Sequence, residues 1–274
     1  MELASIQNIL KTQPAYRLKQ AQKAVFCDLI EDWEQATSLP ADLREKLNKE
    51  APLEIKAEVF VSKDKDTQKA LFALKDRLKI ESVLMRHNNN RNTICVSSQV
   101  GCPLGCKFCA TGQMGFKRNL EFPEIVSQVL FFARVLKTEN KKITNVVFMG
   151  MGEPFLNYQN VLEAIKILND KDGFNLGIRH FSISTVGIIE GIKKMANEEF
   201  QINIAISLHA PNDELRSQIM PINKKYPISQ VLKAVDQYIK ITGRKVMFEY
   251  IMIKGVNDSE KQAKELAKLM QKKL

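Results

Sequence analysis

The sequence predicts an α/β fold in which parallel strands alternate with helices, preceded by a helical region and a short antiparallel meander. Three observations lead to this prediction. From residue 122 onward, apolar runs of strand length alternate with helical patterns, which is typical of a parallel sheet with right-handed crossovers. The run at 143–149 is almost continuously apolar, as expected for a strand buried on both faces. Before residue 66, apolar residues recur instead near the helical period.

The composition is that of a globular protein with a sizeable core and an excess of positive charge. The chain has 274 residues, of which 45% are hydrophobic, and a formal net charge of +10. This charge favours a polyanionic partner such as nucleic acid, although a basic protein without such a partner fits the composition equally well. The sequence has no apolar run near the roughly 20 residues of a membrane span, and its N-terminus lacks a signal-peptide segment. We therefore predict a cytoplasmic protein with no membrane partner.

The first 90 residues are predicted to form two accessory segments. Residues 1–66 are expected to be a helical accessory domain, with helices at 19–36 and 41–51 on either side of the break at Leu39-Pro40. Residues 67–90 are expected to be a linker of antiparallel strands, with strands at 68–75 and 77–85 and a polar turn at 87–91. The meander leads directly into the next strand.

Residues 91–274 are predicted to form the main α/β domain. Its strands are expected at 92–98, 143–149, 180–186, 202–209 and 245–253. Its helices are expected at 122–136, 159–169, 188–197, 228–241 and 258–273. Pro123 stands in the first turn of the first of these helices, where a proline is tolerated.

Three of the five cysteines lie in one tight loop. Cys102, Cys106 and Cys109 have C-x3-C-x2-C spacing, with glycines and a proline supplying the turns between them. Three thiolates would leave one iron of a [4Fe–4S] cluster open for a substrate or cofactor, whereas a closed structural site has four protein ligands. A zinc knuckle with its fourth ligand elsewhere in the chain is the alternative. Cys27 lies in a helical pattern and is expected to be a small core residue.

Small, polar or ionisable residues follow the predicted strands, where the chemistry of (βα) barrels is found. Glu153 follows the second strand in a glycine-rich segment, and such a backbone with one carboxylate suits the α-ammonium group of an amino-acid-like cofactor. The third and fourth strands end in candidate contact residues: Ser184, Ser207, Leu208 and His209. Each has a plainer interpretation, because Glu153 can be solvated, the serines can cap helices and His209 can be a core histidine.

Cys95 lies on the first strand of the main domain. Side chains alternate along a strand, so if Ile94 and Val96 face the surrounding helices, Cys95 faces the interior of the barrel. A buried, inert cysteine is the alternative interpretation.

Long blocks around these residues resemble the RlmN/Cfr family of radical S-adenosylmethionine (SAM) RNA methyltransferases. The blocks are residues 13–20, 91–102, 107–120, 145–154, 205–214 and 220–226. The resemblance implies a partial (βα) barrel of the radical SAM type, with five of its usual six strands present in this sequence. It also implies a [4Fe–4S] cluster on Cys102, Cys106 and Cys109, whose open iron binds S-adenosyl-L-methionine.

The resemblance further implies a methyltransferase acting on C2 of an adenine in 23S rRNA and of an adenine in the anticodon loop of certain tRNAs. Residues 113–119 are more similar to RlmN than to Cfr, and the Cfr-like alternative would methylate C8. C2 is an electron-poor carbon that cannot attack a methyl sulfonium directly, so the cofactor must supply a radical route. The resemblance also implies that an electron donor such as flavodoxin is a partner and that the protein is a monomer.

Individual residues take roles by this resemblance. In the family, one SAM methylates a cysteine near the C-terminus, a second SAM provides the radical that activates this methyl group, and another cysteine resolves the protein–RNA adduct by forming a disulfide. Cys95 matches the resolving cysteine, and Glu81 matches the proposed proton acceptor. The positions that match contacts to SAM are Gly152, Glu153, Ser184, Ser207, Leu208 and His209.

The sequence ends at Leu274, and no cysteine follows Cys109 in it. The family's sixth strand and methyl-carrying cysteine have no counterpart in these 274 residues. We therefore expect this chain by itself to form at most some 5′-deoxyadenosine and no 2-methyladenosine. A truncated iron–sulfur protein that binds RNA without complete methyl transfer is the alternative function.

Overall fold

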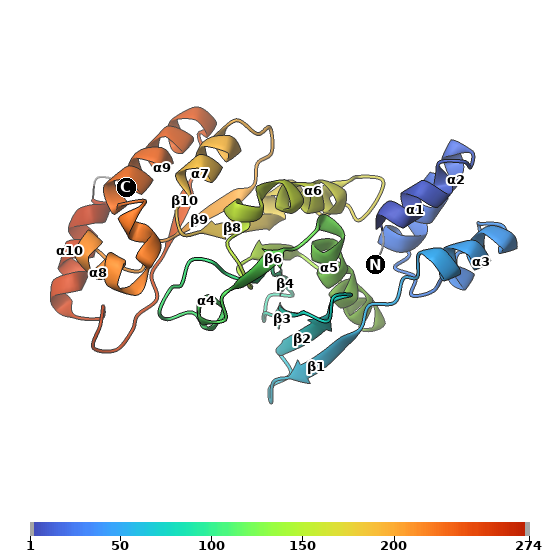
Figure 1. Ribbon diagram of the computed structural model, residues 1–274, viewed down its shortest axis with the longest axis horizontal. Coiled ribbons are helices and arrows are strands. Elements are labelled where there is room, and N and C mark those ends of the chain that lie inside the picture. Colours follow the sequence, from blue (N-terminus) through green and yellow to red (C-terminus); the bar gives the residue numbers. More distant parts are fainter. Residues whose placement is uncertain (1–2, 272–274) are drawn as a thin grey trace. The chain divides into compact units, whose positions relative to one another are not determined.

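The structure is a computed structural model that describes residues 3–271. The chain forms two compact units, which are described separately (Figure 1). The first comprises the residues up to 98 together with 120–150 and 159–181, and the second comprises 99–119, 151–158 and the residues from 182 onward. Among the described residues, no helix has the length and apolar composition needed to cross a membrane.

Helices occupy the N-terminal part of the first unit. They are α1 (Leu3–Leu10), α2 (Ala15–Gln22), the π-helical turn η1 (Lys23–Cys27), the 3-10 turn η2 (Trp33–Gln35) and α3 (Ala41–Glu50). Trp33 is fully buried, and its Nε1 donates a hydrogen bond of 2.8 Å to the carbonyl of Ala51. The prediction of one continuous helix over 19–36 is wrong. The helix ends at Cys27, and Leu29 adopts a left-handed conformation with φ of 53°.

A five-stranded sheet forms the centre of the first unit. Its strands are β1 (Ala57–Val61), β2 (Thr67–Ala73), β3 (Lys79–Arg86), β4 (Asn92–Cys95) and β7 (Asn145–Phe148), in the order β1-β2-β3-β4-β7. The first four are antiparallel neighbours, and β4 pairs with β7 in parallel. The strands predicted at 68–75 and 77–85 are confirmed as β2 and β3. Strand β1 lies inside the segment expected to be helical, although Val59, Phe60 and Val61 have high strand propensity. The proposed domain boundaries at residues 66 and 90 stay predictions.

Helix α5 (Phe122–Thr138) covers one face of this sheet, and the helix predicted at 122–136 is therefore confirmed. The ring of Phe131 on α5 meets Phe72 of β2 edge to face, with ring centroids 5.3 Å apart. Gln128 is fully buried, accepts from the Ser97 backbone N–H at 2.8 Å and donates to the Ser97 carbonyl at 3.0 Å. The helix thus packs on the sheet through apolar contacts and fixes the chain that leaves β4. Helix α6 (Tyr158–Asn169) follows β7.

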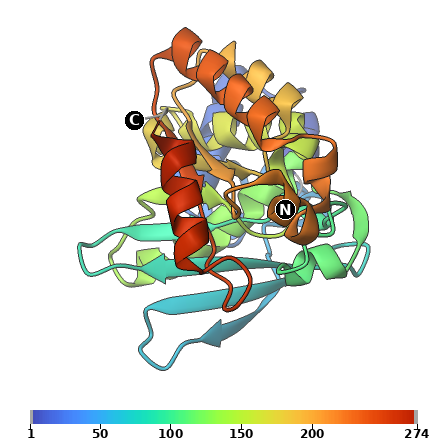
Figure 2. The ribbon, with the colours of Figure 1, turned by 90° about the vertical axis from the view of Figure 1, so that its left-hand side faces the viewer.

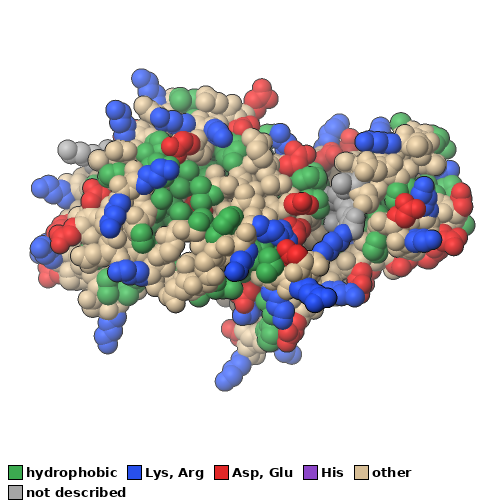
Figure 3. All heavy atoms as spheres, in the orientation of Figure 1, with side chains coloured by type: hydrophobic (Ala, Val, Ile, Leu, Met, Phe, Trp, Pro, Cys, Tyr) green, Lys and Arg blue, Asp and Glu red, His purple; other side chains and the backbone are tan. Residues whose placement is uncertain are grey.

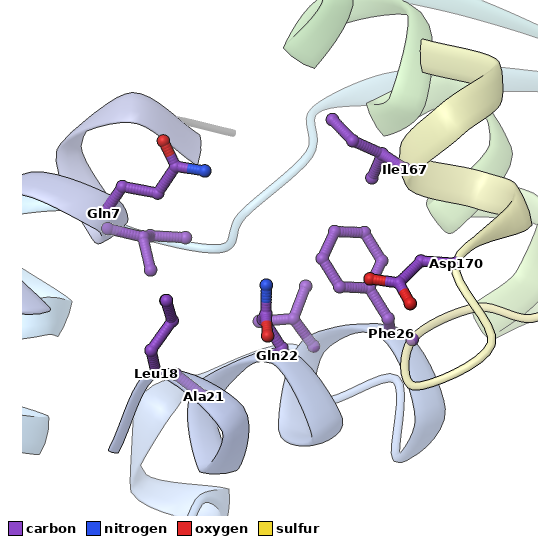
Figure 4. Close-up of a pocket in the computed structure, with 10 residues that line it drawn as sticks. Gln7, Leu18, Ala21, Gln22, Phe26, Ile167 and Asp170 are labelled. Carbon is purple, nitrogen blue, oxygen red and sulfur yellow. The ribbon is translucent and has the colours of Figure 1, made fainter. Parts of the chain in front are cut away.

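A pocket lies between the N-terminal helices and the end of α6 (Figure 4). Phe26 of η1 lies next to Ile167 of α6 and Asp170 on one side of the pocket, and Leu18 of α2 lies on the other side, toward Gln7 of α1. Its wall is mainly apolar, and none of the predicted site residues lines it. The pocket therefore belongs to the packing of the first unit's helices.

The second unit contains a parallel sheet with strands in the order β8-β9-β10. The strands are β8 (Phe181–Thr185), β9 (Asn203–Ser207) and β10 (Val246–Glu249). The helices are α7 (Ile189–Ala196), α8 (Asp213–Ile219), α9 (Ile228–Thr242) and α10 (Glu260–Met270). Helices α7 and α9 lie side by side (Figures 1 and 2). The alternating strands and helices predicted here are confirmed, whereas α8 is an additional helix that the periodicity does not predict.

The five strands predicted for the main domain are all present, as β4, β7, β8, β9 and β10. The pairs β4–β7, β8–β9 and β9–β10 are all parallel, as the α/β prediction requires. A separate hairpin of β5 (Gln99–Gly101) and β6 (Phe116–Asn119) encloses the short helix α4 (Ala110–Gln113) and is not predicted by the sequence pattern. Its strands are too short to show an alternation of apolar and polar residues.

Arg134 joins helix α5 to the N-terminal segment of the same unit. Its guanidinium is buried and donates to the carbonyls of Leu53 at 3.0 Å and Ile30 at 2.6 Å. Burial lowers the pKa of Arg134 below its ordinary value. Because both acceptors are backbone groups, the contact does not depend on a second side chain.

Replacing Arg134 with methionine should lower the melting temperature, because two buried carbonyls lose their donors. An unsatisfied buried group costs about 1–3 kcal/mol, and each kcal/mol corresponds to roughly 2–4 °C in a protein of this size class. For two carbonyls, circular dichroism should therefore show a decrease of roughly 4–24 °C. Arg91→Met, at an exposed arginine, is the matched control. Equal melting temperatures of the two variants would contradict the role of Arg134.

Candidate active site

The cysteine loop lies in the second unit, between the two strands of the β5–β6 hairpin. Gly101 has a φ of +77°, and a Cβ at this position would lie 1.8 Å from the carbonyl oxygen of Gly115. The N–H of Cys102 donates to the same carbonyl at 3.0 Å. Only glycine permits this approach of two backbone segments. The loop is therefore fixed one residue before its first candidate ligand.

Apolar side chains support the loop from behind. Cys106 is 8% exposed and packs in a cluster with Ala210, Ile219 and Met220. Burial raises the pKa of the Cys102 thiol to about 11. Burial, reinforced by the two other loop cysteines, raises the pKa of Cys106 to about 12. These thiols hold their protons at neutral pH, and a metal that binds them must displace those protons.

The donor set has the composition that a [4Fe–4S] cluster with one open iron needs, whereas a closed zinc site takes four ligands around one point. In a four-iron cluster each thiolate binds its own iron, so the three sulfurs need not converge on one point. Three thiols on one loop with apolar support match that requirement.

Glu153 is turned toward the protein backbone. It is 3% exposed, and its two carboxylate oxygens accept from the N–H groups of Phe155 at 3.0 Å and Val186 at 2.9 Å. Burial raises its pKa to about 7, although these hydrogen bonds act in the opposite direction. Gly152 has a φ of +100°, and a Cβ there would lie 2.5 Å from the side chain of Gln99. The carboxylate and the glycine together fix the segment after β7.

Three side chains meet where β8, β9 and β10 end. The hydroxyl of Ser184 donates to Oε2 of Glu249 at 2.5 Å, and that of Ser207 donates to the same oxygen at 3.0 Å. The two hydroxyls are 3.2 Å apart. The backbone carbonyl of Glu249 accepts from the N–H groups of Leu208 at 3.0 Å and His209 at 3.2 Å. One residue thus contacts four of the positions predicted from the sequence.

His209 is a largely buried histidine in a strained conformation, with a φ of 56° and 9% exposure. Its Nδ1 accepts from the N–H of Ile251 at 3.0 Å, and its ring packs edge to face against Phe108 at 5.1 Å. Burial lowers the pKa of His209 to about 4. The ring is therefore neutral at pH 7, and with Nδ1 as an acceptor its proton lies on Nε2.

Arg216 is fully buried and connects the segments that follow β8 and β9. Its Nη2 donates to the carbonyls of Val186 at 2.7 Å and Ser207 at 2.9 Å, and its Nε donates to Leu208 at 2.9 Å. Its Nη1 donates to the side chain of Asn223 at 2.9 Å. Burial lowers its pKa to about 10, so the group is still charged at neutral pH.

Glu81 and Cys95 belong to the first unit. Val83 of β3 lies directly opposite Cys95 of β4, and Glu81 lies two residues from Val83, so both candidate side chains share one face of the sheet. The Glu81 carboxylate is 46% exposed and lies 3.0 Å from Nζ of Lys69. Burial raises the pKa of Cys95 to about 11. The sheet thus brings a carboxylate and a thiol to the same surface.

Comparison with known proteins identifies the family. Residues 96–267 match the model of the radical SAM superfamily. The probable dual-specificity RNA methyltransferase RlmN of Dictyoglomus turgidum is 47% identical, over 99% of this chain and 78% of that protein. The ribosomal RNA large subunit methyltransferase N of Nitrosopumilus maritimus is 46% identical, over 93% of this chain and 75% of that protein. The chain belongs to the RlmN family of radical SAM RNA methyltransferases.

A solved structure agrees with this placement in the RlmN family. The crystal structure of a radical SAM methyltransferase from Sphaerobacter thermophilus superposes with a TM-score of 0.93 at 42% identity, covering 99% of this chain and 80% of that chain. The predicted family and the predicted α/β fold of the radical SAM type are thereby confirmed. The roles of individual residues stay predictions.

Two residues that hold the ends of β8, β9 and β10 in place, Glu249 and Arg216, are absent from those predicted from the sequence. Glu249 stands inside the otherwise mostly apolar run 245–253, and an ionisable residue in such a strand is a signal that could have identified it. Arg216 lies in α8, a helix that the sequence pattern does not reveal, and its partners are backbone carbonyls. Neither feature of Arg216 leaves a trace in the local sequence.

Arg216→Lys should destabilise the second unit, because an ammonium on a flexible stem cannot reproduce a planar fork of donors. The buried carbonyls left without donors should each cost about 1–3 kcal/mol of unfolding free energy. Urea unfolding followed by circular dichroism measures this loss. Arg91→Lys at an exposed site should have no effect. An unfolding free energy that is unchanged in Arg216→Lys would show that the fork is dispensable.

Proposed function

We propose that this chain is a radical SAM enzyme that methylates C2 of an adenine in 23S rRNA and of an adenine in the anticodon loop of tRNA. The observation that carries the proposal is the loop of Cys102, Cys106 and Cys109 in a chain whose relatives are named as RNA methyltransferases. The proposal includes a cytoplasmic, monomeric protein that receives its electron from a donor such as flavodoxin.

The three loop cysteines would hold the [4Fe–4S] cluster, and its open iron would bind SAM. When bound, this cofactor pair supplies the one-electron chemistry that lets a methyl-derived carbon add to the electron-poor C2 atom. Gly152 is assigned to SAM because a residue without a side chain permits close approach of a ligand to the backbone. Glu153 fixes that segment through its two backbone hydrogen bonds.

The remaining SAM contacts are assigned to the residues that end β8 and β9. Ser184 and Ser207 offer hydroxyl groups, and Leu208 provides the backbone position between Ser207 and His209. His209 is neutral and presents Nε2–H as a donor, since its Nδ1 already accepts from Ile251. Its strained backbone supports a functional assignment, because left-handed conformations of residues other than glycine cluster at functional sites.

Glu81 and Cys95 are assigned to the RNA side of the reaction. We assign Glu81 as the acceptor of the proton that leaves adenine C2. Its carboxylate is partly exposed on the same sheet face as Cys95. Cys95 is assigned as the resolving cysteine. Its thiolate would attack the sulfur of the family's methyl-carrying cysteine, so that an S–S bond forms, the S–C bond of the adduct breaks and the released carbon takes up a proton. The raised pKa of Cys95 means that the thiol must lose its proton before it can act as a nucleophile.

The sheet of the first unit also offers a surface for the RNA. The ladder register places Phe60, Lys69, Val83 and Cys95 opposite one another in a single row across β1 to β4. Phe60 is 47% exposed, and Nζ of Lys69 lies 5.6 Å from its ring centroid. Exposed aromatic rings on a sheet are platforms on which unstacked RNA bases stack. On the face in Figure 3, basic side chains are spread over the surface and stand among acidic ones.

Cys106→Ser should abolish the iron–sulfur centre, whereas Cys27→Ser should not. Anaerobic reconstitution of the wild type should give about four irons per chain. Cys27 lies outside the loop, with its Sγ 3.0 Å from the carbonyl of Gly173, and is the matched control. Iron content and the visible absorption spectrum measure the result. A loss of iron in Cys27→Ser or Cys95→Ser as complete as in Cys106→Ser would contradict the assignment of the ligands.

Phe60→Ala should weaken RNA binding, because a stacked base contributes about 1–3 kcal/mol, equivalent to roughly 5- to 150-fold in affinity. Fluorescence anisotropy with a labelled tRNA anticodon stem-loop measures the dissociation constant. Val59→Ala is the matched control, since Val59 is 42% exposed on the same strand but points to the other face. Identical affinities of the two variants would exclude Phe60 as a stacking platform.

The position of methylation is tested in a bacterial strain that lacks its own C2 methyltransferase and carries this chain extended by the C-terminal segment of a longer relative, because the family's methyl-carrying cysteine has no counterpart in these 274 residues. Mass spectrometry of nucleosides from 23S rRNA and tRNA should detect 2-methyladenosine. Detection of 8-methyladenosine instead would establish the Cfr-like alternative. The absence of both nucleosides would overturn the proposed methyltransferase function.

A further inference from the structure

We propose that Glu249 is a further residue of the SAM site, which binds the ribose hydroxyl groups of SAM and sets the orientation of Ser184 and Ser207. This inference rests on the proposed function and deepens it. It concerns only residues at the ends of β8, β9 and β10 in the second unit.

The hydrogen bonds of the two serines define what they can offer to a ligand. A serine hydroxyl has one hydrogen to donate and lone pairs that accept. Ser184 lies 2.5 Å and Ser207 lies 3.0 Å from the same carboxylate oxygen, Oε2 of Glu249. A hydrogen bond to a carboxylate is stronger than one to a hydroxyl, so both hydrogens are directed at Glu249 rather than at the other serine 3.2 Å away, and both serine oxygens present lone pairs elsewhere. The serines are acceptors for a ligand that brings its own hydrogens.

The second oxygen of the Glu249 carboxylate is open to a ligand. Within residues 3–271, Oε1 accepts no hydrogen bond from the protein, and no Lys or Arg side chain forms an ion pair with Glu249. The residue is partly buried. A carboxylate that is partly removed from water without a cation is costly unless further donors reach it. A ligand rich in hydrogen-bond donors would supply them.

Glu153, which follows β7, differs from Glu249 in its hydrogen bonds. Both of its oxygens accept from backbone N–H groups, and the side chain is 3% exposed. Its hydrogen bonds stabilise the segment after β7. Of these two glutamates, Glu249 is the one with a carboxylate oxygen that accepts no hydrogen bond from the described residues.

The ribose of SAM is the group that fits this set of acceptors. The groups of SAM that carry hydrogens able to form hydrogen bonds are the α-ammonium group, the two ribose hydroxyls and the adenine amino group. The α-ammonium group belongs to the methionine part of SAM, which the proposed function places at the cluster and the segment of Gly152 and Glu153, away from the ends of β8, β9 and β10. The remaining vicinal diol has two neighbouring donors, and the serine oxygens 3.2 Å apart, together with Oε1 of Glu249, form neighbouring acceptors. An adenine amino group has both hydrogens on one atom and matches this arrangement less well.

The test compares a ribose ligand with its deoxy counterpart. The ligands are SAM, S-adenosylhomocysteine and S-(2′-deoxyadenosyl)homocysteine, and their binding to the anaerobically reconstituted protein is measured by calorimetry. The wild type should bind S-adenosylhomocysteine about 10-fold or more tightly than the deoxy ligand, as expected for a hydrogen bond to a charged group. In Glu249→Gln, one acceptor becomes a donor. We expect this preference to disappear and the affinity for SAM to fall about 10- to 100-fold.

Glu260→Gln is the matched control, because the Glu260 side chain is 83% exposed on α10. It should bind all three ligands like the wild type. Iron content and melting temperature of each variant establish that the cluster and the fold are intact. If Glu249→Gln retains the wild-type preference for the ribose ligand, the role of Glu249 is overturned while the proposed function stands. If the iron-loaded wild type binds no SAM, the proposed function itself fails, and this inference fails with it.

Discussion

The buried guanidinium of Arg216 is the interaction on which the second unit's candidate site depends. A charge without solvent is tolerated in a protein only where its donors are satisfied. Arg216 donates to the carbonyls of Val186, Ser207 and Leu208, which belong to the segments leaving β8 and β9. These carbonyls are fixed by a rigid planar fork. The positions of Ser207 and Leu208 therefore depend on a side chain whose N–H groups donate to other groups of the protein.

A second level of organisation is built on these strand ends by Glu249. Its backbone carbonyl accepts from Leu208 and His209, and its side chain accepts from Ser184 and Ser207. Glu249 thereby connects the end of β10 to two hydroxyl groups and two backbone N–H groups. Arg216 donates to the backbone carbonyls of this region, and Glu249 accepts from its backbone N–H groups and hydroxyls. The two residues therefore satisfy the acceptors and the donors, respectively, of the same region.

The features predicted from the sequence are those that leave a local pattern. The strands of the main domain appear as apolar runs, and the cysteine loop and Glu153 appear as motifs of a few residues. Features that depend on distant partners leave no such pattern. Ser184 and Glu249 are 65 residues apart, and the break at Leu29 is a backbone conformation that leucine rarely adopts. The β5–β6 hairpin depends on the approach of Gly101 to Gly115, which appears in the sequence only as two glycines.

The sheet face of the first unit places a geometric condition on the RNA. Phe60 and Cys95 stand in one row, three strands apart, and neighbouring strands are about 4.8 Å apart, which gives a span of roughly 14 Å. Bases stacked in a helix are separated by about 3.4 Å. A base on Phe60 therefore cannot be the stacked neighbour of an adenine at Cys95. On the proposed roles of these residues, the RNA has to present two bases that are not immediate neighbours in a stack, and single-stranded loops with splayed bases meet this condition. The width of the sheet is thus a constraint that the proposed RNA contacts have to satisfy.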